Sequence, residues 1–260
     1  MSIKLEIIEI WKHRTLLLDI AVTDLKVRYK HSILGFFWSF LEPLLLLIIL
    51  SLVFTHVFSF EIENYALYLL ANLVLWNMFT RSTTMGLTSM IAKAGIITKI
   101  YFPRELVVVS SSLTSFFMFV FEFMIFFIFV AAFQFVPSIT LAFVPVPLVL
   151  LFIVSLGISF GLAVTNVFFR DIQSIWTILL QAGFFLTPII YKLDILPKSV
   201  QELLYYSPLV RIFEMFHNSI LYNQLPSNWD ITYSVITSLV ILVVGFLAFY
   251  KFQAKAVEEL

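Results

Sequence analysis

The chain has 260 residues, of which 61% are hydrophobic and only 12% are charged, and its mean hydropathy is +1.02. A soluble domain usually has about a quarter charged residues, so this excess of apolar side chains cannot be hidden in one globular core and predicts an integral membrane protein. The formal net charge is zero, which argues against a nucleic-acid partner, and the lack of cysteine excludes disulfides and thiolate metal sites.

Residues 1–30 are amphipathic and too charged to cross a membrane. Charges interrupt their apolar residues every few positions, as in MSIKLEIIEIWKHRTLLLDI. A helix of this kind lies in the membrane interface, with its apolar face in the lipid and its basic face toward anionic head groups. We therefore predict an interface helix at 1–30.

Long apolar runs follow this segment and account for the rest of the predicted fold. A bilayer core requires about 20 apolar residues per helix, and these runs do not alternate between apolar and polar residues as barrel strands do. The predicted fold class is an all-α polytopic membrane protein with six transmembrane helices. They are expected at about 35–59, 65–88, 106–133, 141–167, 173–190 and 231–250.

Lysine and arginine are distributed unequally between the predicted connections, and this asymmetry sets the orientation. With the N-terminus in the cytoplasm, the outer side holds only Lys192, Lys198 and Arg211, and all other basic residues lie on the inner side. Arg81 belongs either to an inner connection or to the second span, and the orientation is the same in both cases. Both termini are therefore predicted to be cytoplasmic.

The segment 25–43, LKVRYKHSILGFFWSFLEP, places basic residues directly before the first predicted span. One interpretation is a topology anchor with interfacial aromatic residues. The other is a binding site for an anionic lipid head group, in which Gly35 allows a sharp turn into the span. The residues alone leave both interpretations open.

Two connections between the predicted spans are more apolar than solvated loops. The segment 90–105, MIAKAGIITKIYFPRE, either rests on the membrane or inserts into a cytoplasmic partner, and its helical part should end at the Phe102-Pro103 break. The external connection 191–229 has apolar residues at helical spacing. We expect it to form short helices that dip into the outer leaflet and return.

Nucleotide, metal and catalytic motifs are missing from the sequence. It contains no G-x-x-x-x-G-K-[ST] phosphate loop, no H-E-x-x-H motif and no His/Asp/Glu cluster with ligand spacing. We therefore assign no catalytic residue, metal ligand or cofactor to this chain, and any ATP must be bound by another subunit.

Two acids, Glu42 and Glu122, lie within the apolar runs. A carboxylate is costly in lipid, so both should face the protein interior or reach the interface. Glu122 is nearer to mid-span and should have a partner. Two acids without an intramembrane His–carboxylate series do not favour a proton-coupled transporter.

Five segments, in order and covering about residues 20–221, resemble the membrane subunit of type-2 ABC exporters that move polysaccharides. They are DLKVRYKHSILGFFWSFLEP, KAGIITKIYFPRE, TNVFFRDI, TPIIY and YSPLVRIFEMFHNSIL. The resemblance is strongest to O-antigen exporter permeases, and capsule and teichoic-acid exporter permeases are relatives.

This resemblance implies an assembly and a substrate. Two copies of this chain, a homodimer, would work with two copies of a separate ATP-binding cassette subunit that binds ATP and Mg²⁺, in the bacterial inner membrane. The substrate would be an O-antigen polysaccharide on a polyprenyl-diphosphate lipid. The whole of 1–260 would form one transmembrane domain. Its first part would be the interface helix at 1–30, followed by spans one to five at 31–190, which include a coupling helix at about 90–104. External gate helices would follow at 191–229, and the sixth span with a cytoplasmic tail at 230–260.

The resemblance and the residues together give four sets of candidate site residues. The lipid diphosphate is expected to bind at Arg28, Tyr29, Lys30, Leu34 and Gly35. Coupling to the ATPase is expected at Lys93, Ile97, Lys99, Tyr101, Phe102, Pro103 and Arg104. Channel aromatics, on which the apolar faces of sugars can slide, are expected at Phe36, Phe37, Trp38 and Phe40. The external gate is expected at Tyr205, Tyr206 and Tyr222.

Other functions remain as alternatives. A type-2 ABC exporter with this architecture could also carry capsule, teichoic acid, lipid or drug substrates. A membrane enzyme of glycan-lipid synthesis would need a carboxylate or histidine cluster at an interface, and the sequence contains no convincing one. A secondary transporter would work alone with an ion gradient, whereas this chain is expected to require its ATPase.

Overall fold

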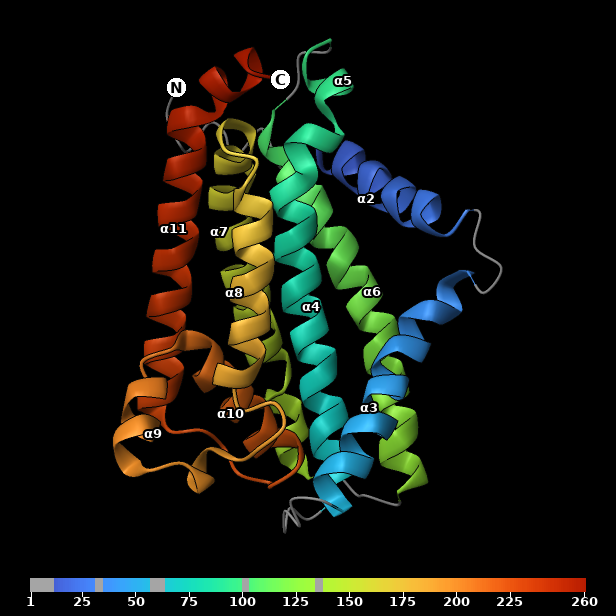
Figure 1. Ribbon diagram of the computed structural model, residues 1–260, viewed down its shortest axis with the longest axis vertical. Helices are drawn as coiled ribbons and strands as arrows, with labels where there is room; N and C mark the ends of the chain where they lie inside the picture. The colour runs from blue at the N-terminus through green and yellow to red at the C-terminus, as the bar shows by residue number, and fades with distance from the viewer. Residues whose placement is uncertain (1–11, 31–34, 57–63, 100–102, 134–137) are drawn as a thin grey trace.

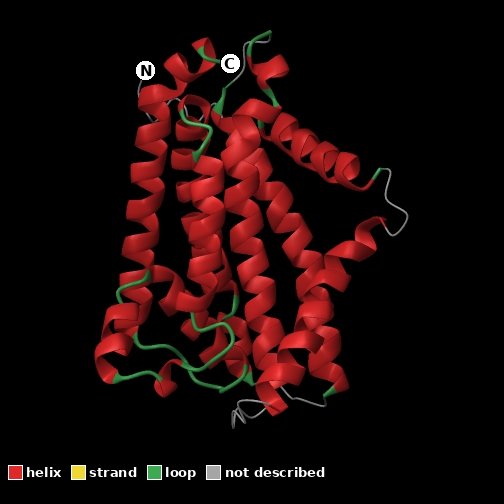
Figure 2. Cartoon of the chain, viewed as in Figure 1, coloured by secondary structure: helices red, strands yellow, loops and turns green. Residues whose placement is uncertain are grey.

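A computed structural model describes residues 12–30, 35–56, 64–99, 103–133 and 138–260 (Figure 1). Within these ranges the regular elements are helices and no strand occurs (Figure 2). The predicted all-helical fold class is thus confirmed for the described part of the chain.

The helices follow the predicted apolar segments closely. In chain order they are α2 (Arg14–Tyr29), η1 (Gly35–Phe37), α3 (Trp38–His56), α4 (Tyr65–Ala92), α5 (Ala94–Ile97), α6 (Glu105–Ala132), η2 (Ile139–Phe143), α7 (Pro145–Phe168), α8 (Ile172–Leu186), η3 (Leu193–Ile195), α9 (Lys198–Leu204), α10 (Pro208–Ile220) and α11 (Asn228–Glu258). In the described part of the chain, three helical stretches are long and apolar enough to cross a membrane: Glu105–Ala132, Ile139–Phe168 and Asn228–Glu258. Shorter apolar helices occur at Leu41–Val53 and Ile172–Leu186.

Helix α4 lies at the centre of the bundle, against α3, α6, α7 and α8 (Figure 1). Most of its residues are buried, and their side chains join rings from α6 and α10 in one apolar core. Phe119 and Phe126 of α6 and Phe213 and Phe216 of α10 are among its largest fully buried members. A polar side chain on α4 therefore faces other helices, which is the position expected of functional groups inside a membrane bundle.

Glycines allow α7 and α11 to pack with their backbones in contact. A Cβ atom built on Gly245 would lie 1.9 Å from the Gly157 carbonyl oxygen, and one built on Gly157 would lie 2.7 Å from the Ile241 carbonyl oxygen. Small residues permit this close approach, on which helix association in membranes depends because lipid tails are as apolar as leucine. The glycine pair brings the backbones of α11 and α7 together, and Phe249 and Ala256 of α11 are also buried.

The two unusual connections lie at opposite ends of the bundle. Helix α5 and the C-terminal end of α11 are at one end, whereas α9 and α10 are at the other (Figure 1). The described parts of the predicted connections 90–105 and 191–229 thus lie at opposite ends of the bundle.

Candidate functional site

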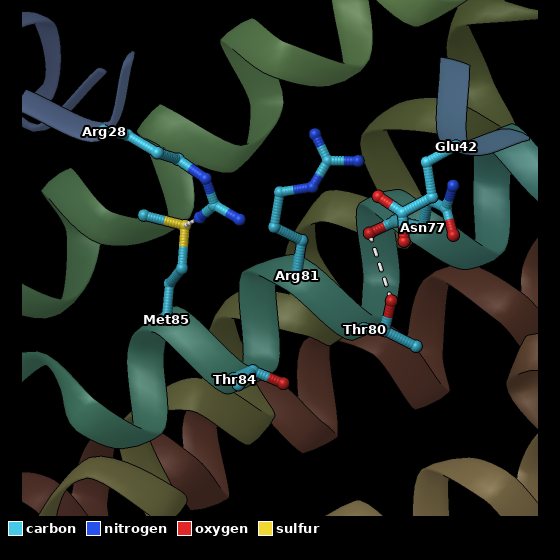
Figure 3. Close-up of a pocket in the computed structure, with 7 residues that line it drawn as sticks. All are labelled: Arg28, Glu42, Asn77, Thr80, Arg81, Thr84 and Met85. Carbon is cyan, nitrogen blue, oxygen red and sulfur yellow. Dashed lines mark hydrogen bonds between the residues drawn. The ribbon is translucent and has the colours of Figure 1, made fainter. Parts of the chain in front are cut away.

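A polar pocket of about 230 Å³ lies between the C-terminal end of α2, the start of α3 and the middle of α4 (Figure 3). We call it the two-arginine pocket. Its walls are formed by Arg28, Glu42, Asn77, Thr80, Arg81, Thr84 and Met85. The guanidinium groups of Arg28 and Arg81 both point into it, from different helices (Figure 3). Two cations in one pocket between apolar helices indicate an anion site.

Arg28 is held at the pocket by the way α2 docks on the bundle. Leu17 and Ala21 of α2 are buried, and the Ala21 carbonyl oxygen accepts a hydrogen bond from Thr114 of α6 at 3.2 Å. Helix α2 exposes Val27 and other apolar residues, as expected of a helix in the membrane interface. This docking brings the last turn of α2, with Arg28, against α4.

The guanidinium group of Arg28 has a poor hydrogen-bond acceptor. Its Nη1 lies 3.7 Å from the sulfur of Met85, and a thioether accepts hydrogen bonds only weakly. Among the described residues no carboxylate forms an ion pair with Arg28. The group is therefore free to bind an anion.

Arg81 forms an ion pair between α4 and α6. Its Nη2 donates to Glu122 Oε1 at 2.5 Å, and the two side chains are only 11% and 1% exposed. The expectation that Glu122 has a partner is confirmed, and Arg81 belongs to the helix rather than to a connection. Sequence reasoning missed Arg81 as a site residue, although an acid and a base within apolar runs are a sufficient signal for such a pair.

Of the other residues predicted to bind the lipid diphosphate, Tyr29, Lys30 and Gly35 do not line this pocket. Gly35 has a φ of +51°, a left-handed conformation that glycine adopts readily and that is compatible with the predicted turn before α3. Tyr29 is half-buried and Lys30, the C-cap of α2, is exposed. Leu34 lies outside the described residues.

A second cavity, of about 410 Å³, lies between α3, α4 and α8. We call it the aromatic cavity. It is lined by Leu46, Leu73, Trp76, Asn77, Thr80, Thr177, Leu180, Gln181, Phe184 and Phe185. Its combination of rings and amide groups suits the apolar faces and hydroxyl groups of sugars. Asn77 and Thr80 line both cavities, so the two are neighbours.

Two of the predicted channel aromatics, Phe37 and Trp38, are not among the rings of this cavity. Phe37 and Trp38 are exposed near the start of α3 and do not line it. The side chains of Phe36 and Phe40 lie outside the described part of the structure. Sequence reasoning missed Trp76 and Phe184 because aromatic residues are so frequent in this chain that only the packing of α4 against α8 distinguishes them.

The described part of the predicted coupling segment contains the short helix α5, and some of its residues are fixed to the bundle. Lys93 donates to Asp24 of α2 at 2.5 Å, and Ile97 is buried in the core near the end of the bundle. The exposed surface of the segment instead includes Ile96 and Lys99. Pro103 and Arg104 are half-buried just before α6, whereas Tyr101 and Phe102 lie outside the described residues.

Two of the three predicted gate tyrosines, Tyr205 and Tyr222, each lie beside a cation. Tyr205 lies with its ring 5.3 Å from the guanidinium carbon of Arg211, and its carbonyl oxygen accepts from Arg211 Nε at 2.6 Å. The neighbouring Tyr206 is exposed, and its carbonyl oxygen accepts from the Tyr233 hydroxyl. Tyr222 lies 4.6 Å from the Lys192 ammonium group. Burial raises the pKa of Tyr205 and of Tyr222, so both remain neutral phenols near pH 7.

Arg211 connects α10 to α11 at this end of the bundle. It forms an ion pair with Asp230, and its guanidinium carbon lies 4.3 Å from the centre of the Tyr233 ring. Asp230 also accepts a hydrogen bond from Ser227 at 2.6 Å. Arginine suits such a stacked, paired position better than lysine because its group is planar and presents several donors.

Arg211→Met is therefore expected to loosen the 198–227 segment. The change leaves Asp230 without its cation and removes the ring stack, and we expect a loss of about 1–3 kcal/mol in the stability of this segment. Limited proteolysis of the purified chain in nanodiscs measures this loss of stability, which should appear as faster cleavage between α9 and α11. Arg170→Met, at an exposed arginine in another connection, is the matched control. Equal cutting of both variants and the parent chain would contradict this role.

Known proteins are similar in sequence to this chain over most of its length. Residues 17–221 match the ABC-2 type transporter family. An O-antigen export system permease protein RfbA of Klebsiella pneumoniae is 32% identical over 251 residues, which cover 94% of this chain and 95% of the relative. A protein of the same name from Myxococcus xanthus is 29% identical, and the polysialic acid transport protein KpsM of Escherichia coli is 24% identical, each over 90% of this chain and 91% of the relative. The resemblance to type-2 ABC exporter permeases is thus confirmed, and the chain belongs to the ABC-2 type transporter family.

Proposed function

We propose that this chain is the membrane-spanning subunit of an ATP-driven exporter that moves polyprenyl-diphosphate-linked O-antigen polysaccharide across the bacterial inner membrane. The similarity to permeases named for O-antigen export, over nearly the whole chain, carries the proposal. The two-arginine pocket supports it, because a diphosphate-linked lipid needs a cationic site beside the membrane.

The proposed assembly contains two copies of this chain and two copies of an ATP-binding subunit. With six spans and both termini in the cytoplasm, α5 and the residues after it would lie on the cytoplasmic side, where the exposed Ile96 and Lys99 meet the ATPase. Helix α8 buries none of its residues inside the chain, and Ile178 and Phe185 are each 64% exposed. A second copy facing α3 and α8 would enclose the aromatic cavity as part of a path for the glycan.

In this mechanism the lipid carrier first binds at the cytoplasmic side. Arg28 attracts the diphosphate, and a basic residue at a membrane surface contributes about 1 kcal/mol toward an anionic head group. The glycan then lies along the aromatic cavity, where Trp76 and Phe184 offer flat apolar surfaces that hold sugars without many fixed hydrogen bonds. The partner subunit binds ATP and Mg²⁺ and supplies the energy.

A capsule polysaccharide is the second candidate substrate. The similarity to KpsM, named for polysialic acid transport, favours it over teichoic acid, lipids or drugs. The lower identity, 24% against 32%, makes O-antigen the first choice. Export of each lipid-linked glycan by the same reconstituted complex would distinguish the two.

The test of this function is co-purification of the full chain with the ATP-binding subunit produced alongside it. We expect a stable complex that hydrolyses ATP. The double change Ile96→Asp with Lys99→Asp should reduce the recovered complex by at least about tenfold, because each change puts a charge or a reversed charge into the contact. The control is Val200→Asp with Lys198→Asp on α9, at the opposite end of the bundle. Failure of the parent chain to bind any ATP-binding subunit would contradict the proposal.

A further inference from the structure

We infer that Arg28 and Arg81 together bind a diphosphate group in the two-arginine pocket, and that Glu42 opposes this binding. The lipid source of the diphosphate rests on the proposed function. The roles of Arg81 and Glu42 are assigned from the structure alone. With them, the site is a defined pocket rather than a single basic residue that attracts lipid at the membrane surface.

The first observation is an excess of hydrogen-bond donors. A guanidinium group carries five N–H donors, and the two groups point into one pocket (Figure 3). Among the described residues their side-chain acceptors are the sulfur of Met85 and one oxygen of Glu122. A diphosphate supplies several charged oxygens in a geometry that matches the planar fork of arginine.

The second observation is an unpaired amide in the same pocket wall. The Nδ2 of Asn77 is buried and has no hydrogen-bond partner within the described residues. A buried donor without a partner costs free energy, so an acceptor bound beside the two cations would be stabilised by this amide once its side chain turns into the pocket. Thr80 does not compete for that acceptor, because its hydroxyl group already donates to the Trp76 carbonyl oxygen at 3.0 Å.

The third observation is the ion pair that holds Arg81 in place. Glu122, on α6, uses one oxygen for Arg81, and its Oε2 has no partner among the described residues. The pair makes a charged arginine tolerable inside the bundle and fixes its direction. The remaining N–H groups of Arg81 then face the pocket without a rearrangement of the helix (Figure 3).

The surroundings of the pocket indicate a lipid rather than a soluble anion. Glu42 marks the pocket end of α3, and farther along this helix Ile48, Ile49 and Leu52 are each more than half exposed. An anionic head in the pocket therefore leaves room for a hydrocarbon chain along the apolar face of α3. Inorganic pyrophosphate has the same head chemistry without the chain, so it is the competing source.

Glu42 allows a test of the direction in which a substitution changes diphosphate binding. Its carboxylate lines the same small pocket and no ion pair neutralises it within the described part of the chain. A like charge there repels the diphosphate. Glu42→Gln should therefore tighten diphosphate binding, whereas loss of the guanidinium group of Arg28 or of Arg81 should weaken it.

The experiment measures binding to the full chain in nanodiscs of neutral lipid, with undecaprenyl diphosphate, undecaprenol and inorganic pyrophosphate as probes. Arg28→Gln and Arg81→Lys should each weaken undecaprenyl diphosphate binding about tenfold or more, because a hydrogen bond to a charged group contributes at least about that factor. Arg81→Lys keeps the cation for Glu122 and so preserves folding. Lys26→Gln removes a charge from the exposed surface of the same helix and is the matched control.

Each result decides a separate question. Undecaprenyl diphosphate binding that is unchanged in Arg28→Gln, Arg81→Lys and Glu42→Gln overturns the inference, and so does equal binding of undecaprenol. Pyrophosphate that binds as tightly as the lipid identifies a soluble diphosphate as the ligand. None of these measurements needs the ATPase, so failure of glycan export in the complete complex would refute the proposed function and leave the diphosphate site standing.

Discussion

Glu122→Ala is expected to destabilise the chain more than any other single change at a polar residue. It leaves Arg81 charged and without its ion-pair partner between α4 and α6, where its side chain is only 11% exposed. Removing one partner of a buried ion pair costs about 3–5 kcal/mol, since the remaining charge is neither hydrated nor paired. Thermal unfolding in detergent, followed as the loss of the monodisperse protein peak, measures the effect.

The control for this prediction removes both charges. Arg81→Met with Glu122→Leu replaces the pair by apolar groups of similar volume, which is often neutral or stabilising. We expect the double variant to unfold close to the parent chain while it loses diphosphate binding. If the double variant were as unstable as Glu122→Ala, packing rather than charge would explain the loss.

Gly245→Ala is expected to separate α11 from α7. The added methyl group would lie 1.9 Å from the Gly157 carbonyl oxygen, and a backbone atom cannot move aside as a flexible side chain can. Overpacking of a well-packed contact costs about 1–3 kcal/mol, and a backbone clash belongs at or above the upper end of that range. Unfolding temperature and the yield of monodisperse protein would both fall, because α7 is the helix against which α11 packs most extensively.

A neighbouring glycine on α7 provides the matched control. A Cβ atom on Gly161 meets nothing within 4 Å, although Gly161 lies one helical turn from Gly157. Gly161→Ala should be neutral or slightly stabilising, since alanine favours a helix by about 1 kcal/mol over glycine. Equal losses in Gly245→Ala and Gly161→Ala would show that the close contact of α7 and α11 is unimportant.

The sequence predicts the helices well because their signal is local. Each apolar run corresponds to a helix, and the turn at Gly35 follows from the one residue type that adopts its conformation readily. The number of spans is less secure from composition: α4 carries Asn72, Asn77 and Arg81 and is less apolar than α6, α7 or α11. A helix that is buried on most sides can contain polar residues. In the sequence alone, these residues look like interruptions of an apolar span.

The site is less predictable because it joins distant segments. Arg28 and its contact Met85 are 57 positions apart, and Arg81 and Glu122 are 41 apart. Their charges show that they need partners, but only the docking of α2 on α6 shows which helix supplies them. The aromatic residues are harder still: Trp76 and Phe37 look alike in the sequence, and their surroundings differ only in the folded bundle.

The ion pair between Lys93 and Asp24 connects the residue before α5 to helix α2, which carries Arg28. Lys93 precedes α5, and Asp24 lies four residues before Arg28 on the same face of α2, so these contacts are one helical turn, about 5.4 Å, apart. Under the proposed function, an ATPase that displaces α5 would also displace the turn of α2 that presents Arg28. Because such linkage is reciprocal, a diphosphate bound at Arg28 would in turn change how readily α5 moves.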